Sequence, residues 1–237
     1  MVLAPVTHLD RRARLCETGS VPIPLPALIF DLDGTITDSK PGIVGCLEKV
    51  LDARHLSYSG SLGRFVGPPV EEWTVELMPD AGEEERAALA REYRACYDRE
   101  GWKNNSVFAG VREMLTELRR RGFPLYVCTS KQQHFAVRIL DAFELAGLFT
   151  AIYGDRAELA NHGKAGLLNS LLRENSLDRD SVWMIGDRVY DFRAAHANHI
   201  RCLAAGWGYG SAEESAQADA IAATPADVPA LVLPRTV

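Results

Sequence analysis

Two aspartates, Asp31 and Asp33, follow the apolar run ALIF in the segment DLDGT. At the end of an extended strand, side chains two residues apart point to the same side. One carboxylate could then attack a phosphorus atom while the second protonates the leaving oxygen. Gly34 would permit a tight turn whose N–H groups face phosphate oxygens. An isolated DxDG segment more often marks a turn of solvated or helix-capping acids, so the other motifs decide.

A second carboxylate pair, Asp187 and Asp191, follows the apolar run 182–185 and Gly186. This order places Asp187 at a strand end and Asp191 one helical turn further on. Carboxylates beside a phosphate are the hard oxygen ligands that Mg²⁺ prefers. The pair therefore favours a Mg²⁺ site. Taken alone, however, the motif is explained equally well by a strand, a turn and a helix cap, with Asp191 exposed to solvent.

Three further polar residues could hold a phosphoryl group. Thr129 and Ser130 follow the apolar run 125–128, where a hydroxyl and a backbone N–H can bind a phosphate oxygen. Taken alone, Thr129 fits better as the cap of the next helix. Lys164 begins a predicted helix, where a cation is poorly matched to the helix dipole. This mismatch hints at function, although most lone lysines are solvated surface residues.

The elements that must position these residues alternate along the chain. Short apolar runs predict strands, and amphipathic patterns between them predict helices. Alternation of this kind predicts an α/β fold, a doubly wound Rossmann-like parallel sheet that binds its ligand at the carboxyl ends of the strands. The predicted strands are 27–30, 125–128, 151–153, 182–185, 200–204 and, more weakly, 218–221; the helices are 111–121, 135–145, 165–175 and 192–198.

One stretch interrupts the alternation. Residues 42–54, 70–78 and 83–100 have the apolar spacing of amphipathic helices, with no convincing strand between them. We expect an α-helical cap at 41–105, inserted into an α/β core made of 25–40 and 106–237. The polar junctions on both sides could act as a paired hinge. Residues 1–24 are expected to form a flexible N-terminal extension.

Composition narrows the partners. The 237 residues carry a formal charge of -6, which gives no electrostatic footprint for a nucleic acid polymer or an anionic membrane. No apolar run reaches the roughly 18 residues needed to span a bilayer. The five cysteines are scattered without a CxxC pair, so neither a disulfide framework nor a zinc site is predicted. We expect a cytoplasmic monomer or homodimer that acts on a small phosphorylated metabolite.

Four elements, DLDGT, the strand-terminal Thr129, Lys164 and GDRVYD, resemble in this order the motifs of the haloacid-dehalogenase superfamily of phosphatases. The resemblance extends over about residues 27–225. It implies that Asp31 forms an aspartyl-phosphate and that Asp33 is the general acid and base. It also implies that Thr129 and Lys164 neutralise the transferring group, and that Mg²⁺ is held by Asp31, the Asp33 carbonyl and Asp187, with Asp191 contributing directly or through a water or Lys164. The segment 154–162 lacks the glycine-rich form common before this lysine.

The inserted cap and the phrase FVGPP resemble the branch that contains phosphoglycolate phosphatase and certain bacterial 5'-nucleotidases. We expect phosphoglycolate-like small acids as substrates, with nucleoside monophosphates as the alternative. Arg64, beside Phe65 in the predicted cap, is expected to meet the leaving group, and its pairing with a surface acid is the competing interpretation. A phosphosugar mutase or phosphotransferase stays open, a phospho-receiver module fits less well, and Asp33 argues against a dehalogenase.

Overall fold

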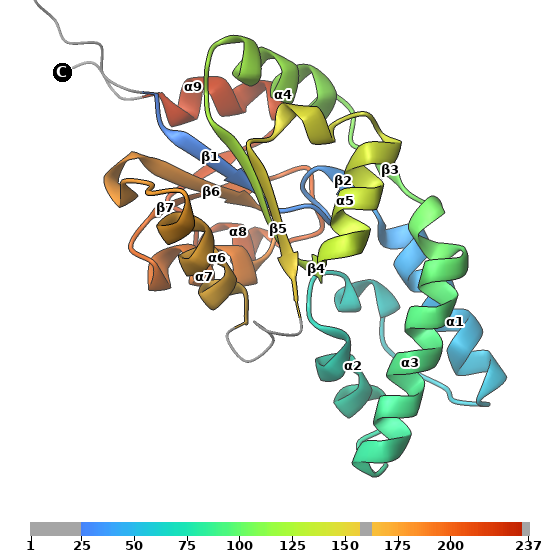
Figure 1. The fold of residues 1–237 in the computed structure, drawn as a ribbon. Coiled ribbons are helices and arrows are strands. Elements are labelled where there is room, and N and C mark those ends of the chain that lie inside the picture. Colours follow the sequence, from blue (N-terminus) through green and yellow to red (C-terminus); the bar gives the residue numbers. More distant parts are fainter. Residues whose placement is uncertain (1–24, 157–162, 234–237) are drawn as a thin grey trace, which may run out of the picture.

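The computed structural model describes residues 25–156 and 163–233, so the expected extension 1–24 lies outside the described residues. The centre of the molecule is a parallel sheet of six strands in the order β5-β4-β1-β6-β7-β8 (Figure 1). This architecture confirms the predicted doubly wound α/β fold. The strands are β1 (Ala27–Phe30), β4 (Leu125–Gln132), β5 (Ala151–Asp155), β6 (Val182–Gly186), β7 (Arg201–Ala205) and β8 (Ala220–Ala222).

The strand β1 lies in the middle of the sheet and is buried on both faces. Leu28 and Phe30 belong to one apolar cluster and Ile29 to another, as the alternation of side chains along a strand requires. It pairs with β4 through Leu28 opposite Leu125 and with β6 through Leu28 opposite Trp183. A continuous apolar sequence is therefore the correct signal for this strand.

Helices cover both faces of the sheet (Figure 1). The cluster with Leu28 and Phe30 includes side chains from α4 (Val111–Arg120), α5 (Gln133–Ala142) and α9 (Val228–Val232). The cluster with Ile29 is completed by α6 (Gly163–Glu174) and α7 (Val189–Ala197). A short helix, α8 (Ala212–Ser215), follows β7. In the described part of the chain, no helix combines the length and apolarity needed to cross a membrane.

Three helices pack around an apolar cluster of their own, and we call them the cap helices. They are α1 (Lys40–Ala53), α2 (Val70–Leu77) and α3 (Glu83–Arg99). A two-stranded antiparallel ribbon, β2 (Thr37–Asp38) with β3 (Ser106–Val107), lies where the chain enters and leaves them. The sequence did not predict this ribbon, because strands of two residues carry no periodic pattern.

Burial in the larger cluster should dominate the stability of the sheet. Leu115 of α4 is fully buried, whereas Leu231 of α9 is 37% exposed. We expect Leu115→Ala to lower the free energy of unfolding by about 2–5 kcal/mol, because the lost contacts leave a cavity. The same substitution at Leu231 should cost about 1 kcal/mol or less. Urea unfolding followed by circular dichroism measures both, and equal losses would contradict the assignment of the core.

Candidate active site

Three neighbouring strands deliver the predicted site residues to one edge of the sheet. Asp31 follows β1, Thr129 lies near the carboxyl end of β4, and Asp187 follows β6. Because β1 pairs with both β4 and β6, these residues converge although they are far apart in the chain. All three are buried. The sheet order therefore creates a buried polar cluster at the place where α/β folds bind ligands.

The centre of this cluster is a group of three carboxylates and one lysine. Oxygen atoms of Asp31, Asp187 and Asp191 lie within 4.8 Å of one another. Lys164 reaches them from the start of α6, with its Nζ 2.6 Å from Asp31 Oδ1 and 2.5 Å from Asp191 Oδ1. The mismatch of this cation with the helix dipole thus has a local cause, since two carboxylates hold it in place.

The pKa values of the cluster reflect crowding of like charges away from water. Burial raises the pKa of Asp31 to about 7, an effect that Lys164 opposes and the neighbouring aspartates strengthen. Burial, together with Asp191 and Asp31, raises the pKa of Asp187 well above its usual range. For Lys164, burial alone would lower the pKa, but the adjacent carboxylates outweigh it and the pKa is raised. The protein alone therefore leaves the negative charge of the cluster undercompensated.

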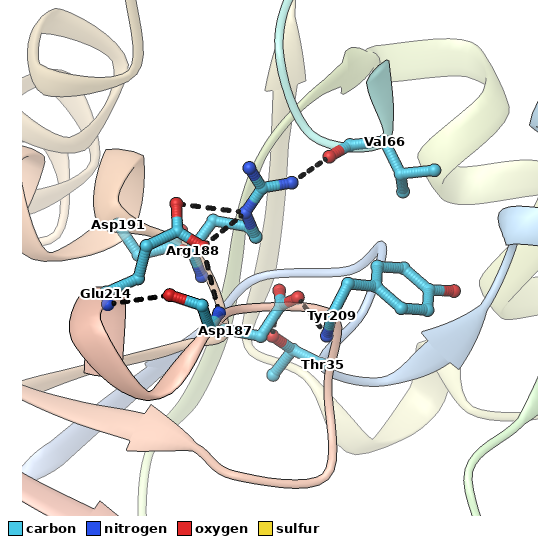
Figure 2. Close-up of polar contacts among 8 residues, drawn as sticks. Thr35, Val66, Asp187, Arg188, Asp191, Tyr209 and Glu214 are labelled. Atoms are coloured by element: carbon cyan, nitrogen blue, oxygen red, sulfur yellow. Dashed lines mark hydrogen bonds and ion pairs between the residues drawn. The ribbon is translucent and has the colours of Figure 1, made fainter. Parts of the chain in front are cut away.

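Asp187 is held in place from two directions (Figure 2). Thr35 Oγ1 donates to its Oδ1 at 3.2 Å, and the backbone N–H of Tyr209 donates to its Oδ2 at 2.8 Å. The Tyr209 hydroxyl in turn donates to Asp38 Oδ1 at 2.7 Å, in the ribbon strand β2. Tyr209 thus contacts both the carboxylate cluster and the segment that leads to the cap helices.

Gly34 has a different use from the one expected. Its backbone N–H donates to the carbonyl of Thr37 at 2.8 Å, so it is not free to face a phosphate. Its φ of +88° lies in the left-handed region, and a Cβ at this position would overlap the Asp187 carboxylate. Glycine is required here because the turn must pass close to Asp187.

Asp33 does not join the carboxylate cluster but pairs with Lys131, which the sequence did not single out. Lys131 Nζ lies 3.0 Å from Asp33 Oδ2 and donates to the hydroxyl of Tyr97 at 2.9 Å. Burial alone would lower the pKa of Lys131, but Asp33 and Tyr97 outweigh it and the pKa is raised. The other oxygen, Asp33 Oδ1, has no hydrogen-bond partner among the described residues. Each of the DxD aspartates therefore has its own lysine.

The segment Thr129–Ser130 lies beside this pair. Thr129 is buried, and its Oγ1 accepts a hydrogen bond from the Lys131 N–H at 3.2 Å. It does not cap the next helix, since α5 begins only at Gln133. Lys131 carried a weak signal in the sequence, as a cation directly after a strand-terminal Thr-Ser pair. Nothing in the sequence indicated that its partner would be Asp33.

A cavity of about 90 Å³ lies over Asp33 and Lys131. Its polar floor includes these two residues and Ser130, and its roof comes from the cap helices. The aromatic walls are formed by Trp73, Tyr93, Tyr97 and Phe135, whose neighbouring rings lie within 4.8–6.0 Å of one another.

The structure does not bring Arg64 to this cavity. Arg64 lies in a short 3₁₀ turn, its side chain is 59% exposed, and its Nη1 lies 3.0 Å from Glu76 Oε1. It borders a separate hollow next to Arg188. The structure therefore contains the surface ion pair that was the competing interpretation, with Glu76 of α2 as the partner.

Arg188 connects the core with the loop before α2 (Figure 2). Its Nη1 donates to the carbonyl of Val66 at 2.7 Å, and its Nε donates to Glu214 Oε2 at 3.1 Å. Glu214 lies in α8 and is fixed by its own capping box with Ser211. The residue next to Asp187 thus holds the loop before α2 over the site.

The described residues fit a divalent cation. Oxygen ligands converge at hydrogen-bonding distances from Lys164, and no sulfur or imidazole ligand is among them, which matches the preference of Mg²⁺. Counted as charged groups, the three acids of the cluster and Lys164 leave two negative charges that one divalent ion would neutralise.

Comparison with known proteins identifies the family of the chain. Residues 28–205 match the haloacid dehalogenase-like hydrolases. A 5'-nucleotidase of Pseudomonas aeruginosa is 35% identical over 193 residues, covering 80% of this chain and 86% of that protein. Tyrosine-protein kinase PtkA of Mycobacterium tuberculosis is 37% identical over 190 residues, covering 78% of this chain but only 64% of that protein.

The solved structures agree with the sequence relatives. A predicted phosphatase from Clostridium acetobutylicum superimposes with a TM-score of 0.81 at 32% identity, covering 89% of this chain and 100% of the other. The resemblance drawn from the four motifs is confirmed. The chain therefore belongs to the haloacid dehalogenase-like hydrolase family.

Proposed function

We propose that this protein is a phosphatase, which hydrolyses a small phosphate monoester through an aspartyl-phosphate on Asp31, with Mg²⁺ as its cofactor. The observation that carries the proposal is the separation of the two DxD carboxylates. Asp31 pairs with Lys164 inside the carboxylate cluster, while Asp33 pairs with Lys131 under the cavity. One acid thus lies where a metal and a phosphoryl group would be held, and the other lies where a leaving group would emerge.

In the first step, an oxygen of Asp31 forms a bond to phosphorus while the bond from phosphorus to the ester oxygen breaks. That oxygen takes a proton from Asp33. In the second step, Asp33 removes a proton from water as the water attacks phosphorus, which releases inorganic phosphate and restores Asp31. Lys164 offsets negative charge near the transferring group, and Thr129 and Ser130 are suited to donate to its oxygens.

Mg²⁺ would be held by Asp31, the Asp33 carbonyl and Asp187, with Asp191 contributing directly, through a water, or by holding Lys164 in place. When bound, the ion supplies positive charge that offsets repulsion between the carboxylates and the phosphate. The hydrogen bonds from Thr35 and Tyr209 fix the orientation of Asp187 before any ion arrives. This preorganisation limits the rearrangement that binding requires.

Substrate choice is assigned to the cavity beneath the cap helices, because the core motifs contact only the phosphoryl group. A volume of about 90 Å³ suits a leaving group of a few heavy atoms. Lys131 and Arg94 border it, so a leaving group that carries a carboxylate would find a cation. We therefore propose phosphoglycolate-like small acids as the substrate class.

A nucleoside 5'-monophosphate is the second candidate. The rings of Trp73 and Tyr93 border the cavity and could stack on a base if the cap helices move outward. The name of the P. aeruginosa relative points the same way. The kinase name of PtkA raises transfer to a tyrosine hydroxyl instead of water, which measurement of free phosphate distinguishes.

The nucleophile can be tested by Asp31→Asn. This change keeps the volume of the side chain but removes the attacking charge, so the rate of phosphate release should fall by at least about a thousandfold. Release of phosphate from 2-phosphoglycolate measures the loss. Near-ultraviolet circular dichroism should match that of the unmodified protein. A folded variant that keeps more than a few per cent of the activity would exclude Asp31 as the nucleophile.

The cofactor can be tested by removing it. Excess chelator should abolish phosphate release, because the buried carboxylates and the phosphate repel one another, and added Mg²⁺ should restore it. Ca²⁺ should not restore it, because its larger and more flexible coordination misplaces the attacking oxygen. Asp187→Asn should raise the Mg²⁺ concentration needed for half-maximal activity at least tenfold. Full activity in excess chelator would refute the role of the metal.

The leaving-group site can be tested by Lys131→Gln. Loss of a charge-assisted hydrogen bond should raise KM for 2-phosphoglycolate by about 10–100-fold. KM for ethyl phosphate, which has no second charged group, should change less than about threefold. Any effect on Asp33 would appear in kcat for both esters.

The matched control is Lys49→Gln on α1, where the lysine is exposed and pairs with Glu100 outside the cavity. It should leave both KM values unchanged. Equal changes in KM for the two esters with Lys131→Gln would show that Lys131 does not select the leaving group. A higher kcat/KM for nucleoside monophosphates than for phosphoglycolate would favour the second candidate.

A further inference from the structure

A group of metal-ligand side chains lies at the other end of α7 from Asp191. It consists of His196 in the last turn of α7, Cys202 in β7, and Asp219 just before β8. From their arrangement we propose a second metal site, one that takes a transition-metal ion such as Zn²⁺. It is independent of the Mg²⁺ site proposed above and differs from it in chemistry.

The three candidate ligand atoms form a nearly equilateral triangle. Cys202 Sγ lies 3.3 Å from His196 Nε2 and 3.4 Å from Asp219 Oδ2, and the nitrogen and oxygen are 3.6 Å apart. With Zn–S of about 2.3 Å and Zn–N or Zn–O of about 2.0–2.2 Å, tetrahedral angles put such ligands about 3.3–3.6 Å apart. An ion could therefore bind all three atoms without large movement of the backbone.

The site has a buried floor and an open side. Cys202 is buried, whereas the side chains of His196 and Asp219 are 49% and 44% exposed. An ion entering from solvent would meet the imidazole and the carboxylate first and the sulfur last. The fourth position would stay open to water. Asp219 is already oriented, because the Cys202 N–H donates to its Oδ2 at 2.8 Å.

The donor set selects the metal. One thiolate, one imidazole and one carboxylate suit Zn²⁺ and its neighbours, whereas Mg²⁺ prefers oxygen ligands alone. Without an ion, burial raises the pKa of the Cys202 thiol to about 12, so the thiol is protonated at neutral pH. Binding would displace that proton to solvent. Zinc affinity should accordingly weaken as the pH falls.

The other thiol-rich group among the described residues does not fit a zinc ion as well. Cys46 and Cys96 lie between α1 and α3 with Glu100 nearby, and their sulfur atoms are 2.7 Å apart. Two sulfurs on one tetrahedral zinc would be about 3.8 Å apart. These sulfur atoms lie too close together to be two ligands of one zinc ion, and the two cysteines provide matched controls.

Binding can be tested on the full chain with Co²⁺ as a spectroscopic probe for Zn²⁺. Excess Mg²⁺ occupies the carboxylate cluster, which contains no sulfur and cannot give a thiolate-to-cobalt charge-transfer band. We expect such a band to saturate near one equivalent of Co²⁺ and to disappear on addition of Zn²⁺. Absence of the band in the unmodified protein would overturn the proposal.

Variants assign the band. Cys202→Ser should remove it and Cys46→Ser should keep it. The opposite pattern would overturn the proposal. Because a buried serine could disturb folding, His196→Gln and Asp219→Asn provide a second measurement at half-exposed positions. Each should weaken Zn²⁺ binding at least tenfold and reduce the Zn²⁺-dependent rise in Tm measured in excess Mg²⁺. An undiminished rise in both variants would likewise overturn it.

Discussion

The central physical constraint on this site is the repulsion among buried carboxylates at the carboxyl edge of the sheet. Asp31, Asp187 and Asp191 are buried close together, and among the described residues only Lys164 pairs with them directly. Such an arrangement is costly in the free protein. The divalent cation proposed above would offset this repulsion.

The fold is arranged to keep these charges close together. The neighbours of β1 in the sheet are β4, which contains Thr129, and β6, which Asp187 follows. Gly34 lets the turn after β1 pass against Asp187, while Tyr209 connects Asp187 with the ribbon leading to the cap helices. A movement of the cap helices could therefore change the position of Asp187 in the carboxylate cluster, through Tyr209.

The cap helices add a second electrostatic environment. Lys131 belongs to the core but donates to Tyr97 of α3, so Asp33 is paired with a lysine that contacts the cap helices. The two DxD aspartates differ in environment although they are two residues apart. This difference supports the proposal that one is the nucleophile and the other the general acid.

Local sequence determined the strands, most helices and the polar residues near the carboxyl ends of β1, β4 and β6. Apolar runs such as 27–30 have few alternatives to a buried strand, and GDRVYD has few alternatives to a strand end followed by a helix. Tertiary structure decided which charges meet. Lys131 pairs with Asp33, and Arg64 pairs with Glu76 instead of bordering the cavity. No sequence motif predicted the triangle formed by His196, Cys202 and Asp219. Pairings of this kind depend on the order of strands and the packing of helices, because distance in space is not encoded in the spacing of a sequence.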